Sequence, residues 1–164
     1  MKVAVLSDTH IPERMRKLPE DLLSCLQGVS FILHAGDVTE WWVIEELSRI
    51  APVYGVCGNM DTPGVASRLP ERRVVELEGI RIGLLHGRGS PEEAERMALR
   101  AFAQEDVQVI VYGHSHRPKL EWQKAFLLVN PGSPTDTVFA PRRTLGRLEI
   151  AEGRILRAEI VALE

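Results

Sequence analysis

The stretch KVAVLSDTH at residues 2–10 runs from a β-branched, apolar segment directly into the polar residues Ser-Asp-Thr-His. An apolar run of this length that ends in polar turn residues predicts a buried strand. The same pattern recurs four times along the chain, and each run is expected to be a buried strand: residues 31–35, 53–57, 80–85 and 107–112.

Amphipathic segments lie between these strands. Apolar residues recur at helical spacing over residues 19–27, 40–50 and 91–104, and Ser-Pro-Glu-Glu at residues 90–93 is typical of a capped helix start. The alternation of strands and helices predicts an α/β fold with parallel strands at its centre. Consecutive strand-like pieces follow from residue 120 onward, and we expect them to form antiparallel hairpins that add a second sheet packed on the first.

The composition predicts one globular domain over residues 1–164. The chain is 45% hydrophobic and 26% charged, and a chain of this length buries roughly 70% of its unfolded surface without needing disulfides. Cys25 and Cys57 lie far apart, which favours reduced thiols in a reducing compartment. No run of about 18 apolar residues is present, and the first residues turn polar too early for a signal peptide. We therefore expect a cytoplasmic protein without a membrane partner.

The charge balance excludes a broad attraction to polyanions. The formal net charge is -3, with 20 basic and 23 acidic residues, so no general field draws nucleic acid or an acidic membrane to the protein. The sequence has no G-x-G-x-x-G after the first strand and no P-loop, which excludes dinucleotide-type binding. We expect no specific nucleic-acid binding, and any preference for phosphate must be local.

The polar residues that follow the strands are the second decisive feature. Ligands of open α/β sheets bind outside the carboxyl ends of strands, so side chains at these ends are expected to converge on one site. Neutral imidazoles, carboxylates and an amide carbonyl are ligands of divalent metals. Seven candidates occupy such positions: Asp8, His10, Asp37, Asn59, His86, His114 and His116.

Seven ligands exceed what one tetrahedral ion can use. Two ions that share a bridging carboxylate would use all of them, and Asp37 is the expected bridge because Gly36 before it lets the backbone come close. The pattern therefore predicts a two-metal hydrolase.

With these residues in order along the chain, the sequence resembles the calcineurin-like metallophosphoesterase superfamily, and within it the small YfcE-type phosphodiesterases. The motifs occur in order as SDTH (7–10), GD (36–37), GNMD (58–61), His86 and GHSH (113–116), followed by NPGS at residues 130–133. The resemblance implies a four-layer α/β/β/α sandwich. It also implies that one metal is held by Asp8, His10, Asp37 and His116, and the other by Asp37, Asn59, His86 and His114.

The sequence departs from the family pattern at two positions. Many larger relatives have histidine where this chain has Met60, and a thioether cannot protonate a leaving group. Either Asp61, another group or solvent then supplies the proton, or only substrates with good leaving groups react quickly. Small relatives often read His-Gly-His at the fourth motif, where this chain has Arg88, which we expect to grip a phosphate oxygen.

His34 precedes the second motif but lies inside a predicted strand, so we expect it to have a structural role and leave it out of the ligand set. The catalytic set is expected to comprise Asp37, Asn59, His86, Asp61 and Arg88.

The expected reaction is hydrolysis of small or generic phosphodiesters by in-line attack of a metal-bridging hydroxide. Mn(II) is the first expectation for the metal, with Ni, Co, Fe or Zn as alternatives, since oxygen and imidazole donors suit all of them. One rival function is a phosphomonoesterase or nucleotidase. Another is a non-catalytic Vps29-like protein-binding scaffold, a fate that usually goes with loss of ligand histidines. The resemblance also implies a homo-oligomer, a dimer or tetramer.

Overall fold

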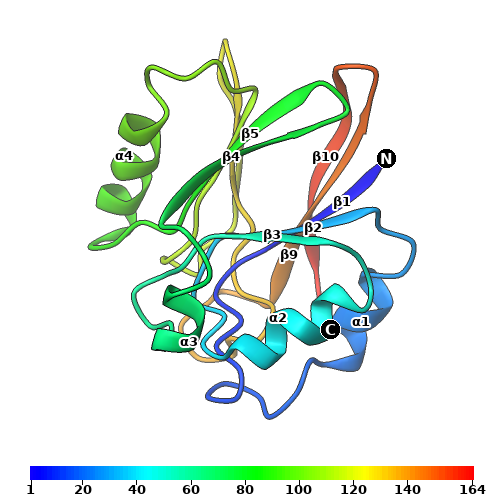
Figure 1. The fold of residues 1–164 in the computed structure, drawn as a ribbon, viewed down its shortest axis with the longest axis vertical. Coiled ribbons are helices and arrows are strands. Elements are labelled where there is room, and N and C mark those ends of the chain that lie inside the picture. The colour runs from blue at the N-terminus through cyan, green and yellow to red at the C-terminus, as the bar shows by residue number, and fades with distance from the viewer.

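The computed structural model describes residues 1–164 and consists of two five-stranded sheets packed face to face (Figure 1). The first sheet has the order β10-β9-β1-β2-β3, with bounds Arg154–Ala162, Thr144–Ala151, Lys2–Leu6, Phe31–His34 and Val53–Gly55. The second has the order β4-β5-β6-β8-β7, with bounds Arg72–Leu77, Ile80–Leu85, Val109–Val111, Leu127–Asn130 and Lys119–Trp122. The helices are α1 (Glu20–Cys25), α2 (Trp41–Ser48), α3 (Pro63–Ala66) and α4 (Pro91–Ala101).

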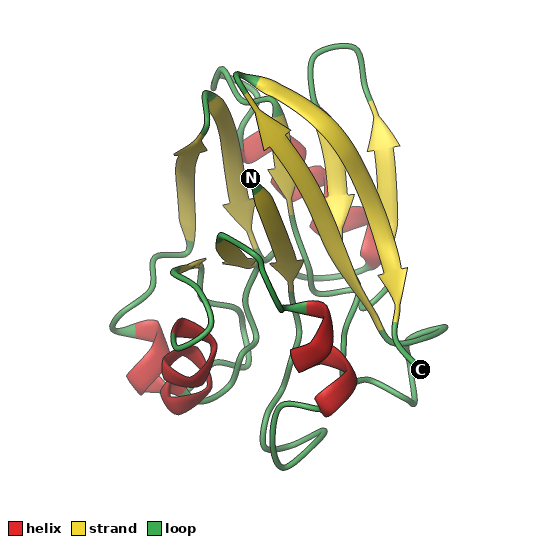
Figure 2. Cartoon of the chain, turned by 90° about the vertical axis from the view of Figure 1, so that its right-hand side faces the viewer, coloured by secondary structure: helices red, strands yellow, loops and turns green.

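Three apolar cores separate four layers, as the resemblance implies. Strand β1 shows why: Val3 and Val5 pack into the core between the sheets, whereas Ala4 and Leu6 pack against the residues of α1 and α2. Because successive side chains of a strand point to opposite faces, one short strand serves two cores. On the far side, α4 covers the second sheet through a third core that includes Ala98 (Figures 1 and 2).

The strand and helix alternation predicted from the sequence is confirmed, and β1, β2 and β3 pair in parallel, as do β5, β6 and β8. The expectation that the C-terminal hairpins form a separate second sheet is wrong. Strands β9 and β10 extend the first sheet, whereas β7 and β8 extend the second. Strand periodicity identifies a strand but says nothing about which sheet it joins.

The sequence pattern did not predict two elements, one strand and one helix. Strand β4 carries Arg72, Arg73 and Glu76 because it is an edge strand with one solvent-facing side, so it lacks a continuous apolar run. Helix α3 has four residues, too few for a helical period to be visible. No helix of the structure is both long and apolar enough to cross a bilayer.

A bidentate ion pair ties α1 to the segment before β9. The guanidinium of Arg143 donates to both carboxylate oxygens of Asp21 at 2.8 Å, and its Nε donates to Pro134 O at 2.7 Å. These hydrogen bonds from Arg143 hold the pKa of Asp21 below its usual value. The pair therefore stabilises the fold above the ordinary aspartate pKa of about 3.9, and this contribution is lost as the pH falls through the lowered value.

We predict that Asp21→Asn lowers the free energy of unfolding by about 1 kcal/mol at pH 7, because the charge-assisted pair is lost. The difference from wild type should shrink below pH 4. Thermal unfolding at pH 7 and at pH 3 measures this difference. Asp106→Asn, at an exposed position without an ion pair, is the control. An equal deficit at pH 3 and pH 7 would contradict this account.

Candidate metal centre

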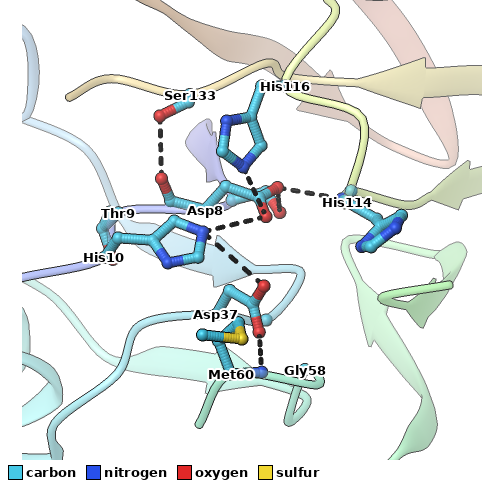
Figure 3. Close-up of polar contacts among 12 residues, drawn as sticks. Asp8, Thr9, His10, Asp37, Gly58, Met60, His114, His116 and Ser133 are labelled. Atoms are coloured by element: carbon cyan, nitrogen blue, oxygen red, sulfur yellow. Dashed lines mark hydrogen bonds and ion pairs between the residues drawn. The ribbon is translucent and has the colours of Figure 1, made fainter. Parts of the chain in front are cut away.

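Six of the predicted ligands meet in two adjacent clusters. Asp8, His10 and His116 form the first cluster, and Asp37, His86 and His114 form the second. Figure 3 labels all of these residues except His86. The residues follow β1 and β2 of the first sheet and β5 and β6 of the second. The predicted convergence of strand ends is thus present, although the strands come from two sheets.

The distances within and between the two clusters are close to those of atoms that share a cation. His86 Nε2 lies 3.0 Å from Asp37 Oδ2 and 3.7 Å from Asp8 Oδ1. His10 Nε2 lies 3.5 Å from Asp8 Oδ1 and 3.6 Å from Asp37 Oδ2. Two atoms that bind one cation at about 2.1 Å, with an angle of about 90–110° between them, are about 3.0–3.4 Å apart.

Each aspartate has one oxygen held by the protein and one turned to the centre. Asp8 Oδ2 accepts hydrogen bonds from Ser7 Oγ at 2.6 Å and from the backbone N–H of His114 at 2.9 Å. Asp37 Oδ1 accepts from the backbone N–H of Met60 at 2.8 Å, while its Oδ2 faces His10 (Figure 3) and also His86. The outer oxygens therefore fix the direction of the inner ones.

Three of the inner atoms are buried without a hydrogen-bond partner: Asp8 Oδ1, His10 Nε2 and His86 Nε2. His86 Nε2 is close to Asp37 Oδ2, but not in hydrogen-bond geometry. Unpaired buried polar atoms cost free energy and are rare in folded proteins. Carboxylate and imidazole atoms grouped in this way fit divalent cations, which would satisfy all three.

The electrostatics of the centre favour positive charge. Burial by itself would raise the pKa of Asp8, but the imidazoles of His86, His10 and His116 outweigh it and hold the pKa well below the usual range. Burial would lower the pKa of His86, yet the two aspartates raise it to about 9. Two buried carboxylates thus create a negative potential that cations relieve.

Hydrogen bonds on the far side of three imidazoles set their orientation. His86 Nδ1 lies 2.8 Å from Ala35 O, and His114 Nε2 lies 2.9 Å from Gly89 O. His116 Nδ1 lies 2.6 Å from a carboxylate oxygen of Asp136. A ring nitrogen that donates outward leaves the other nitrogen free as a ligand.

The backbone of the centre is strained. Five of the six cluster residues have positive φ, a region that non-glycine residues rarely adopt: Asp8 (56°), His10 (43°), Asp37 (57°), His114 (74°) and His116 (59°). Such strain persists only where the surroundings hold it, and it concentrates at functional sites.

Two glycines allow the loops to approach each other. Gly36 has φ of 100°, and a Cβ there would lie 2.8 Å from His86 Nδ1. A Cβ on Gly58 would collide with the carboxylate of Asp37 and lie 2.6 Å from its backbone nitrogen. The close approach predicted for Gly36 is therefore present, and Gly58 adds a second one.

The remaining predicted residues surround the second cluster. Asn59 and Arg88 line, together with His86, a cavity of about 140 Å³ whose other walls include Cys57 and Met97. Both Asn59 and Arg88 are exposed. Ligation of a metal by Asn59 stays a prediction, and the cavity places Arg88 beside the centre.

Asp61 holds two loops together. Its carboxylate accepts backbone N–H groups of Gly58 at 2.7 Å, Thr39 at 2.7 Å and Asp37 at 3.1 Å. Burial raises the pKa of Asp61 against these hydrogen bonds. The side chain thus joins the loop of Asp37 to the loop of Asn59, a contact that sequence reasoning did not foresee.

His34 is buried, its hydrogen-bond partners are neutral, and it belongs to neither cluster. Its Nδ1 accepts from the N–H of Gly36 at 3.1 Å, so Nε2 carries the proton and donates to Thr9 Oγ1 at 3.1 Å. Burial lowers the pKa of His34 to about 4. Both ring nitrogens serve to join the loops after β1 and β2.

Sequence reasoning missed the segment after β8. Ser133 Oγ donates to Asp8 O at 2.8 Å, Thr135 Oγ1 donates to Thr9 O at 2.7 Å, and Asp136 contacts His116. The NPGS stretch indicated a turn but not its partners, since these lie more than 100 residues earlier for Ser133 and Thr135.

Comparison with known proteins identifies the family of the chain. The family described as calcineurin-like phosphoesterase superfamily domain matches residues 1–153. The chain belongs to this superfamily. A probable metallophosphoesterase of Methanothermobacter thermautotrophicus is 38% identical over 98% of this chain and 92% of the relative. A second probable metallophosphoesterase, from Methanocaldococcus jannaschii, is 33% identical over 100% of this chain and 82% of the relative.

Solved structures share the fold as well. Wild-type Vps29 of Entamoeba histolytica, in complex with Zn²⁺, has a TM-score of 0.78 and is 26% identical over 99% of both chains. The two-sheet architecture is therefore shared with Vps29. The fold is common to metallophosphoesterases and to Vps29, so it does not by itself distinguish between them.

We predict that Gly58→Ala weakens metal binding at the second cluster by about tenfold or more, because the added methyl group pushes the loop of Asn59 away from Asp37. Calorimetric titration of the apo-protein with Mn²⁺ measures this. Gly64→Ala in α3, where a Cβ meets nothing closer than 3.8 Å, is the matched control and should bind metal as wild type does. Equal affinities for the two variants would contradict the prediction.

Proposed function

We propose that this metallophosphoesterase is a two-metal-dependent phosphodiesterase that hydrolyses small or generic phosphodiesters. The observation that carries the proposal is the group of orphaned, buried donor atoms of Asp8, His10 and His86, set beside a cavity lined by Asn59 and Arg88. Membership of the phosphoesterase superfamily supports the same chemistry.

The ligand residues set the charge of the centre. In this proposal Asp37 would be the ligand shared by the two ions, because its inner oxygen faces His10 of the first cluster and His86 of the second. When bound, two divalent cations polarise phosphoryl oxygens and lower the pKa of a water, which permits in-line attack on phosphorus at neutral pH. The two ligand carboxylates balance only half of the four charges of such a pair, so the centre attracts an anionic phosphate despite the net charge of -3.

Two further residues have roles in this proposal. Arg88 binds a phosphate oxygen of the substrate from the cavity wall through its guanidinium group. Asp61 positions the loops and takes no part in proton transfer, because its oxygens already accept three backbone N–H groups. The proton for the leaving group then comes from solvent or another group, which favours substrates with good leaving groups.

A protein-binding scaffold is the rival to test against. Vps29 has the same fold and is described in complex with Zn²⁺, so metal binding alone does not establish catalysis. The test must therefore measure hydrolysis.

We predict that the wild-type protein hydrolyses bis(p-nitrophenyl) phosphate faster than p-nitrophenyl phosphate when Mn²⁺ is added. Ni²⁺, Co²⁺, Fe²⁺ and Zn²⁺ are compared in the same assay, and chelation should abolish turnover. Asp37→Ala should lose at least about 100-fold in kcat/KM and retain less than the two ions per chain expected of wild type. Asp106→Asn serves as control.

Two outcomes would count against the proposal. A wild-type protein that binds metal but hydrolyses neither ester with any of the five metals would favour the scaffold function. A faster rate with the monoester would favour a phosphomonoesterase.

We predict that Arg88→Met raises KM for the diester about tenfold, equivalent to about 1.4 kcal/mol, because one charged contact to phosphate is lost. The kcat value and the metal content should change much less, since Arg88 belongs to neither ligand cluster. Steady-state kinetics with metal analysis separates the two effects. An unchanged KM would remove Arg88 from substrate binding.

A further inference from the structure

The three imidazoles with an outward hydrogen bond do not have equivalent partners. His86 and His114 each form this hydrogen bond with a backbone carbonyl oxygen, whereas His116 forms it with the carboxylate of Asp136. A carboxylate partner strengthens the hydrogen bond and increases the basicity of the opposite ring nitrogen more than a neutral carbonyl does. The first cluster therefore has a feature that the second lacks.

The side chain of Asp136 is held in place from all sides. It is fully buried, and its Oδ1 accepts from the backbone N–H groups of Val138 at 2.8 Å and Phe139 at 3.0 Å. Its Oδ2 accepts from the N–H of Ala140 at 3.0 Å and faces His116 Nδ1 at 2.6 Å. Such a network leaves the carboxylate one orientation, with Oδ2 toward the imidazole.

The orientation of the Asp136 carboxylate determines which ring nitrogen of His116 faces the metal centre. Because Nδ1 faces Asp136, the Nε2 atom is the one directed at the centre, where it lies 3.3 Å from Asp8 Oδ1. Rotation of the ring would break the short contact with a buried carboxylate, which is costly. The segment after β8 thus fixes one ligand of the first cluster.

Arg14 provides a counter-charge on the other oxygen. Its Nη1 lies 3.2 Å from Asp136 Oδ1, and its guanidinium lies over the Phe139 ring at 5.3 Å. Arg14 therefore neutralises part of the charge of Asp136 without touching His116. This arrangement allows charge and position to be tested separately.

We propose that Asp136 is a positioning residue that makes the first cluster, Asp8, His10 and His116, the tighter of the two metal sites, so that the cations bind in sequence. The inference rests on the two-cation centre of the proposed function and adds an order of loading to it. Asp136 acts through His116 and touches neither cation nor substrate.

The test is a titration of the metal-free protein with Co²⁺ alone, followed by calorimetry and by the visible absorbance of the bound ion. Wild type should show two binding events of different affinity. His114→Ala, which removes a ligand of the second cluster, should abolish the weaker event and keep the tighter one.

Asp136→Asn should weaken the tighter event by about 10–100-fold and leave the weaker one within about threefold. Arg14→Met keeps the contact between Asp136 and His116 and removes the counter-charge, so the tighter event should become stronger or stay unchanged. If Asp136 merely stabilised its loop, both substitutions would weaken binding together. Thermal unfolding of the metal-free variants shows that each is folded before titration.

Three results would overturn the inference: equal affinity of wild type and Asp136→Asn for Co²⁺, loss of the tighter event in His114→Ala, or a weaker tight event in Arg14→Met. If wild type hydrolyses diesters in any of these cases, the order of loading fails while the proposed function stands. If wild type binds no metal at all, both fail.

Discussion

The burial of two carboxylates beside one another is the constraint on which the rest of the structure depends. Asp8 is fully buried and Asp37 nearly so, and His86 Nε2 lies within 3.7 Å of an oxygen of each. Neighbouring buried anions oppose folding unless hydrogen bonds and positive charge compensate them. The outer oxygens receive hydrogen bonds from Ser7 and from backbone N–H groups, while the inner oxygens face imidazoles.

The architecture supplies this compensation by bringing strand ends from two sheets together. Five loops, those after β1, β2, β3, β5 and β6, must approach one another closely, which explains both the glycine at position 58 and the positive φ values of the cluster residues. The three apolar cores provide the free energy that holds these strained loops in place. The loops in turn direct the donor atoms of the two clusters toward one another.

Residues outside the clusters complete the centre. Asp61 joins the loops after β2 and β3, His34 joins the loops after β1 and β2, and the segment after β8 fastens the loop that carries Asp8. Apart from the contact between His34 and the Thr9 hydroxyl, these contacts are made to backbone atoms, so the identity of the contacted residue leaves no trace in the sequence. Asp61 was predicted as a candidate proton donor for this reason, because its motif position was visible and its three partners were not.

The sequence by itself determined the chemistry of the donor set and the class of fold. Apolar runs that end in Asp and His predict strands and a shared site, because periodicity and strand-end position are local properties of the chain. Only the tertiary structure decided which sheet each strand joins, which nitrogen of His116 faces the centre and that Asp136 is its partner. Those features depend on packing between distant segments, which local patterns do not encode.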